Sequence, residues 1–228
     1  MGRLASLAAA LFLAAGTAAA RDYPAVSIDY FALFDRTCSE MAKRPVEEAA
    51  MRETETRLEE FRAQWARDEA ALLGSVVAVT GVAFRFAETR AALVSCGFQS
   101  MSLPLLVNVR PYLATVSGTN LAPMSDFSNT LFHEALHRYV VDAIRALPGG
   151  TTPLLKKYAS EHPAVRSHVH LFAIERLVYR KVGREKELEA TIEVENTFRG
   201  AAAFRRARAI VAEEGAEALV RELTPTGR

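Results

Sequence analysis

The sequence of 228 residues lacks an excess of charge of either sign, since it has 28 lysines and arginines, 27 aspartates and glutamates and a formal net charge of +1. A surface that binds nucleic acid needs densely placed basic side chains, which release counterions from the phosphates. The balance therefore argues against a nucleic-acid partner. It gives no electrostatic indication of the substrate.

Long apolar runs are missing after residue 20, so we expect no membrane span in that part of the chain. Before it, Arg3 is followed by an apolar stretch over residues 4–15 and by small residues at 18–20. This pattern is typical of a secretory signal peptide, and the stretch is shorter than the roughly 20 residues that span a bilayer. We expect residues 1–20 to be a signal peptide, the protein to be exported to the periplasm or secreted, and residues 21–228 to form a single domain.

Cysteine is scarce, with Cys38 and Cys96 alone in the chain. Neither belongs to a Cys-x-x-Cys pattern, so we assign them no redox or metal role. In an oxidising compartment the two are able to form one disulfide, and two separate buried thiols are the alternative.

The pattern of apolar residues predicts an α+β fold, with a small antiparallel sheet in the first half and a helical second half. Pro45 begins a stretch with helical spacing that extends to residue 73. Four β-like segments follow, at residues 75–80, 82–86, 91–96 and 105–113. Helices are then expected at residues 127–147, from Pro163 to about Lys181, and over residues 184–222 with a break at Gly200.

The clearest chemical motif is His133-Glu134-Ala135-Leu136-His137, in the first of these later helices. Histidines four residues apart lie one turn apart on the same helical face, so both imidazoles reach a single ion. Glu134 points about 100° away around the helix, beside such an ion and not onto it. A carboxylate there is placed to take a proton from water and to deliver it to a leaving amine.

The segment from Thr130 to His137 resembles the active-site helix of the zincin metallopeptidases. The resemblance implies a Zn²⁺ cofactor, His133 and His137 as metal ligands and Glu134 as the general base. Val140 and Ala143 exclude the metzincin branch, which has glycine and histidine at these positions. The gluzincin branch takes its third ligand from a glutamate on a later helix, for which Glu175 is the natural candidate.

The surroundings of Glu175 support that choice, because its neighbours three and four residues away along the helix are all apolar or aromatic. These neighbours are Leu171, Phe172, Val178 and Tyr179. A carboxylate on an apolar face needs a cation, either a zinc ion or an arginine such as Arg138. His168, His170 and His162 remain alternatives for the third ligand.

Tyr179 stands where thermolysin-like members have an aspartate that orients a ligand histidine. We therefore expect Asp126, Asn129 or Asp142 to orient the histidines, and we consider Tyr179 or Tyr158 as a catalytic donor to the oxyanion. The strand expected at residues 105–110 offers an edge to which a peptide substrate could add, with an ordinary structural strand as the alternative.

These features predict an exported zinc metallopeptidase that hydrolyses peptide bonds. The alternatives are a non-catalytic zinc- or partner-binding envelope protein on the same fold, and a helical binding module in which the motif is accidental.

Overall fold

The structure is a computed structural model, and it describes residues 21–198 and 200–224. The expected signal peptide at residues 1–20 lies outside the described residues. Within them, no helix combines the length and the apolar character needed to cross a membrane.

The strands form one four-stranded sheet with the order β1-β2-β4-β3. Its members are β1 (Ala25–Tyr30), β2 (Glu88–Val94), β3 (Met101–Ser102) and β4 (Leu105–Asn108). β1, β2 and β4 are parallel, and only the short β3 runs antiparallel to β4. The α+β class is confirmed, but the expectation of an antiparallel sheet is wrong.

The parallel direction has a physical cause in the connection between β1 and β2, which contains three helices and returns the chain to the end where β1 began. The strand expected at residues 75–80 is the last part of one of these helices, and residues 82–86 form no strand. The expectation of a free edge at residues 105–110 is also wrong, because β4 lies between β2 and β3.

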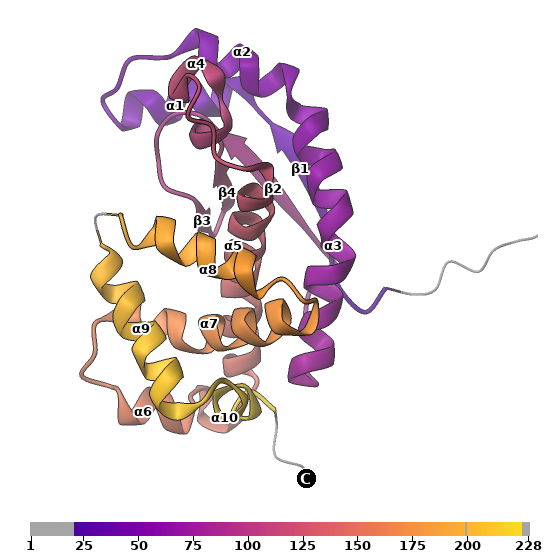
Figure 1. The fold of residues 1–228 in the computed structure, drawn as a ribbon, viewed down its shortest axis with the longest axis vertical. Helices are drawn as coiled ribbons and strands as arrows, with labels where there is room; N and C mark the ends of the chain where they lie inside the picture. The colour runs from indigo at the N-terminus through magenta and orange to yellow at the C-terminus, as the bar shows by residue number, and fades with distance from the viewer. Residues whose placement is uncertain (1–20, 199, 225–228) are drawn as a thin grey trace, which may run out of the picture.

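Helices α3 and α5 pack against the sheet, and helices build most of the second half of the chain (Figure 1). The α-helices are α1 (Ala32–Met41), α2 (Glu48–Thr56), α3 (Leu58–Thr80), α4 (Ala114–Ser117), α5 (Met124–Arg145), α6 (Pro153–Lys157), α7 (Pro163–Lys181), α8 (Glu185–Glu195), α9 (Ala201–Glu214) and α10 (Ala216–Arg221). Single 3-10 turns occur at η1 (Arg110–Tyr112) and η2 (Pro148–Gly150). The expected helices at residues 127–147 and from Pro163 to Lys181 are confirmed as α5 and α7.

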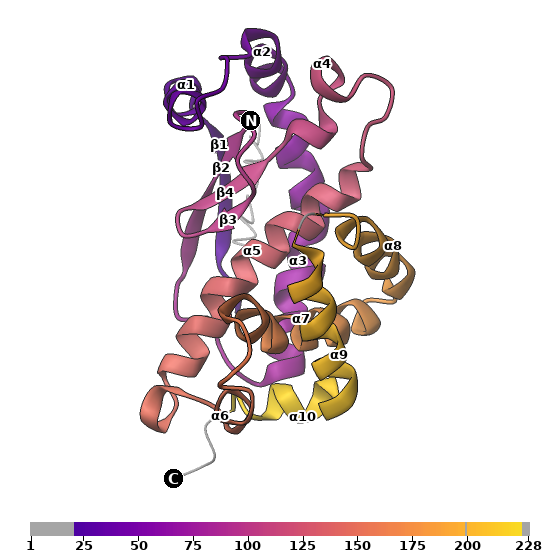
Figure 2. The ribbon, with the colours of Figure 1, turned by 90° about the vertical axis from the view of Figure 1, so that its left-hand side faces the viewer.

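Helix α5 is the element that joins the two halves. Figure 2 shows the sheet on one side of α5 and the helices α7, α8 and α9 on the other. Phe127 near its start packs against Phe61 of α3, with ring centroids 4.9 Å apart. One buried apolar cluster contains residues from Ile28 to Leu223. The helix that carries the motif is therefore held from several sides, which fixes the direction of its side chains.

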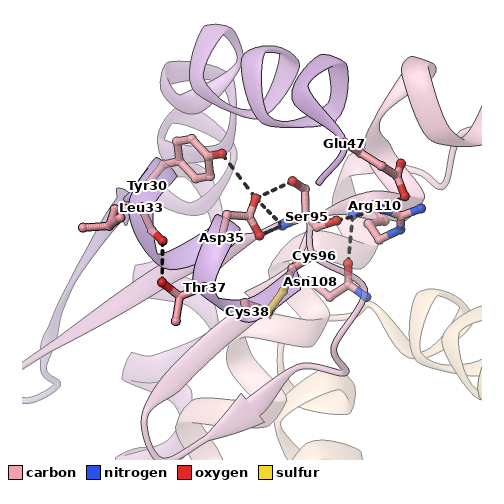
Figure 3. The surroundings of a disulfide bond; sticks show 10 residues. All are labelled: Tyr30, Leu33, Asp35, Thr37, Cys38, Glu47, Ser95, Cys96, Asn108 and Arg110. Atoms are coloured by element: carbon pink, nitrogen blue, oxygen red, sulfur yellow. Dashed lines mark hydrogen bonds and ion pairs between the residues drawn. A yellow bond between two sulfur atoms is a disulfide. The ribbon is translucent and has the colours of Figure 1, made fainter. Parts of the chain in front are cut away.

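The two cysteines form a disulfide in the structure. Cys38 of α1 is bonded to Cys96, two residues after the end of β2, and their Cα atoms are 5.8 Å apart (Figure 3). The bond ties the first helix to the sheet.

Candidate metal centre

The candidate site lies where α5 and α7 pack together. The buried apolar residues of α5 surround His133, Glu134 and His137, and α7 contributes His168 and Glu175 from one of its faces. His168 and Glu175 are seven positions apart, which is two helical turns, so both face α5. The crossing of two helices thus brings together groups that are distant in the sequence.

Three histidines converge at this crossing. One ring nitrogen from each of His133, His137 and His168 lies within 4.8 Å of those of the other two. The ring centroid of His137 is 4.9 Å from that of His133 and 4.7 Å from that of His168. In tetrahedral zinc sites with Zn–N bonds of about 2.0–2.1 Å, imidazole nitrogens are common ligands. The donor set therefore fits a zinc ion after small side-chain movements.

Two of these rings are oriented by hydrogen bonds from their other nitrogen. His133 Nδ1 lies 2.9 Å from Glu175 Oε1, and His168 Nδ1 lies 2.6 Å from the carbonyl oxygen of Ala164. A carboxylate and a carbonyl accept hydrogen bonds, so the Nδ1 atoms of both rings carry the proton. When these rings are neutral, Nε2 is the atom with a free lone pair, which is the arrangement seen around metal-ligating histidines.

The surroundings keep two rings neutral. Burial, together with the charge on His133, lowers the pKa of His137 to about 3 and that of His168 to about 4. Burial also lowers the pKa of His133, but the adjacent Glu175 carboxylate outweighs it and leaves that pKa raised. Neutral imidazoles are the form that binds a metal ion.

Glu134 is the acidic member of the site, and its side chain is only 8% exposed. Burial raises the pKa of this carboxyl to about 7, against the opposing effect of His133. A carboxyl group that titrates near neutral pH is suited both to accept a proton and to donate it again.

A cavity of about 510 Å³ reaches the site from the His133 side. His133, Glu134 and Glu175 line it, whereas His137 and His168 are not among its lining residues. The opposite wall comes from α8, α9 and the segment between them, and its larger apolar members are Leu188, Val194, Phe198 and Phe204. The cavity has the size of a small-ligand or peptide pocket.

The other residues expected at the site have different positions. Glu175 contacts His133 and is not part of the group of three. The hydroxyl of Tyr179, which lines the cavity, donates its hydrogen to Asn129 Oδ1, so Asn129 orients Tyr179 and not a histidine. Tyr158 donates to Glu214 at 2.5 Å, outside the cluster.

His162 caps the start of α7, where its Nδ1 accepts from the backbone nitrogen of Ala164. His170 is buried, with Nε2 3.1 Å from Glu222 Oε2. Arg138 stacks on Phe86, its guanidinium carbon 3.9 Å from the ring centroid. None of these three approaches the group of three histidines.

Phe204 of α9 is a site neighbour that the sequence did not indicate. Its ring centroid is 4.6 Å from that of His168 and 6.3 Å from that of His133. An apolar ring packed beside these imidazoles limits the access of water to them. A single phenylalanine in a helix carries no signal for this role, since most such residues belong to a core.

No protein-family model, curated protein or solved structure matches this chain.

Proposed function

We propose that the protein is a zinc-dependent peptidase in which His133, His137 and His168 hold the ion and Glu134 is the general base. The observation that supports it most is the convergence of three ring nitrogens within 4.8 Å, beside a buried carboxyl group. Three protein ligands with a fourth position for water are the usual composition of a catalytic zinc site.

The third ligand in this proposal differs from the one that the resemblance implies. Glu175 Oε1 is 2.9 Å from His133 Nδ1, a distance that fits a hydrogen bond between carboxylate and imidazole. We assign Glu175 the role of orienting His133, because a hydrogen bond to Nδ1 leaves Nε2 directed toward the ion. The face that carries Glu175 also carries His168, which takes the ligand position.

Zinc in such a site acts as a Lewis acid that polarises a carbonyl and lowers the pKa of water. Glu134, which lines the cavity next to His133, takes a proton from the attacking water and transfers it to the leaving amine. Its low exposure and its raised pKa support this role. Tyr179 has its hydrogen engaged with Asn129, so an oxyanion role would require that bond to rearrange.

A peptide bond is proposed as the substrate because the motif helix resembles that of the zincin metallopeptidases and because the cavity has room for a chain segment next to Glu134. We also propose that the protein is exported. The disulfide between Cys38 and Cys96 supports this, since disulfides are characteristic of oxidising compartments.

The test is a paired measurement of zinc content and peptide hydrolysis in the wild type and in Glu134→Gln. We expect about one zinc per chain in both proteins, and hydrolysis only in the wild type. Zinc with equal, negligible turnover in both would favour a non-catalytic zinc-binding protein instead. A wild type that binds no zinc would overturn the proposal.

A further inference from the structure

The cavity next to the metal centre contains an acidic group for which the proposed chemistry has no use. Four carboxylates line it, from Asp126, Glu134, Glu175 and Glu195. Glu175 is bonded to His133, and Glu195 forms an ion pair with Arg208. Glu134 is the proposed base. Asp126 is left: its backbone oxygen accepts from Thr130, but its carboxylate has no hydrogen bond or ion pair with any residue that the structure describes.

No basic side chain balances Asp126 within the cavity. None of the described residues that line it is a lysine or an arginine. Asp126 is partly buried, and burial together with the nearby charge of Glu187 raises its pKa. The charge of Glu187 is itself engaged by Arg184, with Nε 2.8 Å from Oε2. An uncompensated negative charge in a partly buried pocket favours a ligand that brings a cation.

The distance between Asp126 and the motif determines which kind of cationic group on a ligand can reach Asp126. Asp126 lies seven positions before His133 on α5, which is two turns and places both on the same face about 10 Å apart along the axis. Tyr112 and Leu188 line the same cavity and offer apolar surface. A group that reaches from the scissile bond to Asp126 must be long, with an apolar stem and a charged end. Lysine and arginine side chains have this construction.

We infer that Asp126 selects substrates with a lysine or arginine next to the scissile bond, whose stem packs along Tyr112 and Leu188 and whose charged end pairs with the Asp126 carboxylate. The inference rests on the proposed peptidase function and names its substrate class. It makes Asp126 a specificity-determining residue with no part in the proton transfer.

Asp126 also lies in the first turn of α5, where a negative charge is favourable for the helix. Its replacement is therefore expected to lower stability slightly whether or not it binds substrate. A binding measurement between matched peptides separates the two roles, because a purely structural residue does not discriminate between peptide side chains.

The test uses the zinc-loaded full chain carrying Glu134→Gln, so that peptides bind without being cleaved. Blocked pentapeptides that differ only in a central lysine, arginine, norleucine or glutamate are titrated, and the wild type is assayed for cleavage of the same set. We expect the lysine and arginine peptides to bind about tenfold more tightly than the norleucine peptide, as for one charge-assisted hydrogen bond. Adding Asp126→Asn should reduce that ratio to about one, and Asp126→Lys should favour the glutamate peptide.

Asp142→Asn provides the matched control, since Asp142 is on the same helix but does not line the cavity. It should keep the tenfold ratio. If the Asp126 variants do not fold, the salt dependence of the lysine-to-norleucine binding ratio is measured in the Glu134→Gln protein instead, because an ion pair weakens as salt is added.

Equal or tighter binding of the norleucine peptide in the Glu134→Gln background would overturn the inference, and so would a ratio that Asp126→Asn leaves unchanged. Cleavage by the wild type without preference for a basic residue would overturn this inference alone. Failure to bind or cleave any peptide of the set would overturn both it and the peptidase function.

Discussion

The polar network around Asp35 and the histidine group on α5 and α7 both place polar side chains in the interior, but they differ in how fully those groups are hydrogen-bonded. Asp35 is 1% exposed. Its two carboxylate oxygens each accept from the backbone nitrogen of Ser95 at 3.0 Å, and one also accepts from the hydroxyl of Tyr30 at 3.2 Å (Figure 3). The neighbouring sulfurs of Cys38 and Cys96 are bonded to each other.

The histidine group has the opposite arrangement. Two of its rings are hydrogen-bonded through Nδ1, His133 to Glu175 and His168 to the carbonyl oxygen of Ala164. One ring nitrogen of each of the three histidines lies within 4.8 Å of the other two, and an imidazole nitrogen that carries no proton is able to accept a cation. The hydrogen bonds of Asp35 fit a structural role, whereas for the histidine group we propose that it binds a metal ion.

Removing the disulfide tests the first half of this comparison and should have the largest effect on stability. The bond closes a loop with a sequence separation of 58 residues, for which chain entropy gives a contribution of about 4 kcal/mol. Cys38→Ser with Cys96→Ser should lower the free energy of unfolding by that order in denaturant titration. Zinc affinity of the folded fraction should stay unchanged, and a loss of zinc would mean that the two regions are coupled.

Glu175→Gln tests the second half, with an effect on metal binding that is larger than its effect on stability. Glutamine accepts a hydrogen bond from His133 Nδ1 more weakly than a carboxylate does, so His133 is held less well. We expect zinc affinity to fall by about 10- to 100-fold in a competition with a coloured chelator. Complete loss of zinc would instead indicate that Glu175 is itself a ligand, as the family resemblance implies.

Arg138→Gln should have the smallest effect, although Arg138 directly follows His137 in the sequence. Its guanidinium lies over the ring of Phe86 and not toward the histidines. Loss of a partly exposed cation–π contact costs about 0.5–1 kcal/mol in thermal or chemical unfolding. Zinc content should equal that of the wild type, and a reduced content would show that the site extends beyond the residues assigned to it.

The sequence predicts the elements of the site better than their arrangement. The spacing of His133 and His137 specifies one helical face, and Pro163 and Gly183 mark the ends of α7, so both helices were predicted. Residues 75–80 have the β-branched composition of a strand, yet they continue α3 as far as Gly81, whose φ of 67° ends the helix. Packing of that segment in the core outweighed its local preference.

Which residue of α7 joins His133 and His137 depends on information that the sequence does not carry. His168 and Glu175 share a face of α7. The crossing of α7 over α5 decides which of the two lies with the ring nitrogens of His133 and His137. That crossing results from side-chain packing along both helices. The same holds for the parallel direction of β1 and β2, which follows from the helices between them and not from the residues of the strands.

A crystal structure of the zinc-loaded protein, with the ion located by anomalous scattering, tests the central claim most directly. We expect one zinc with nitrogen ligands from His133, His137 and His168 at about 2.0–2.1 Å, and the Glu175 carboxylate hydrogen-bonded to His133. A zinc bound by Glu175 in place of His168, or rings of His133 and His137 that share no ion, would contradict this account.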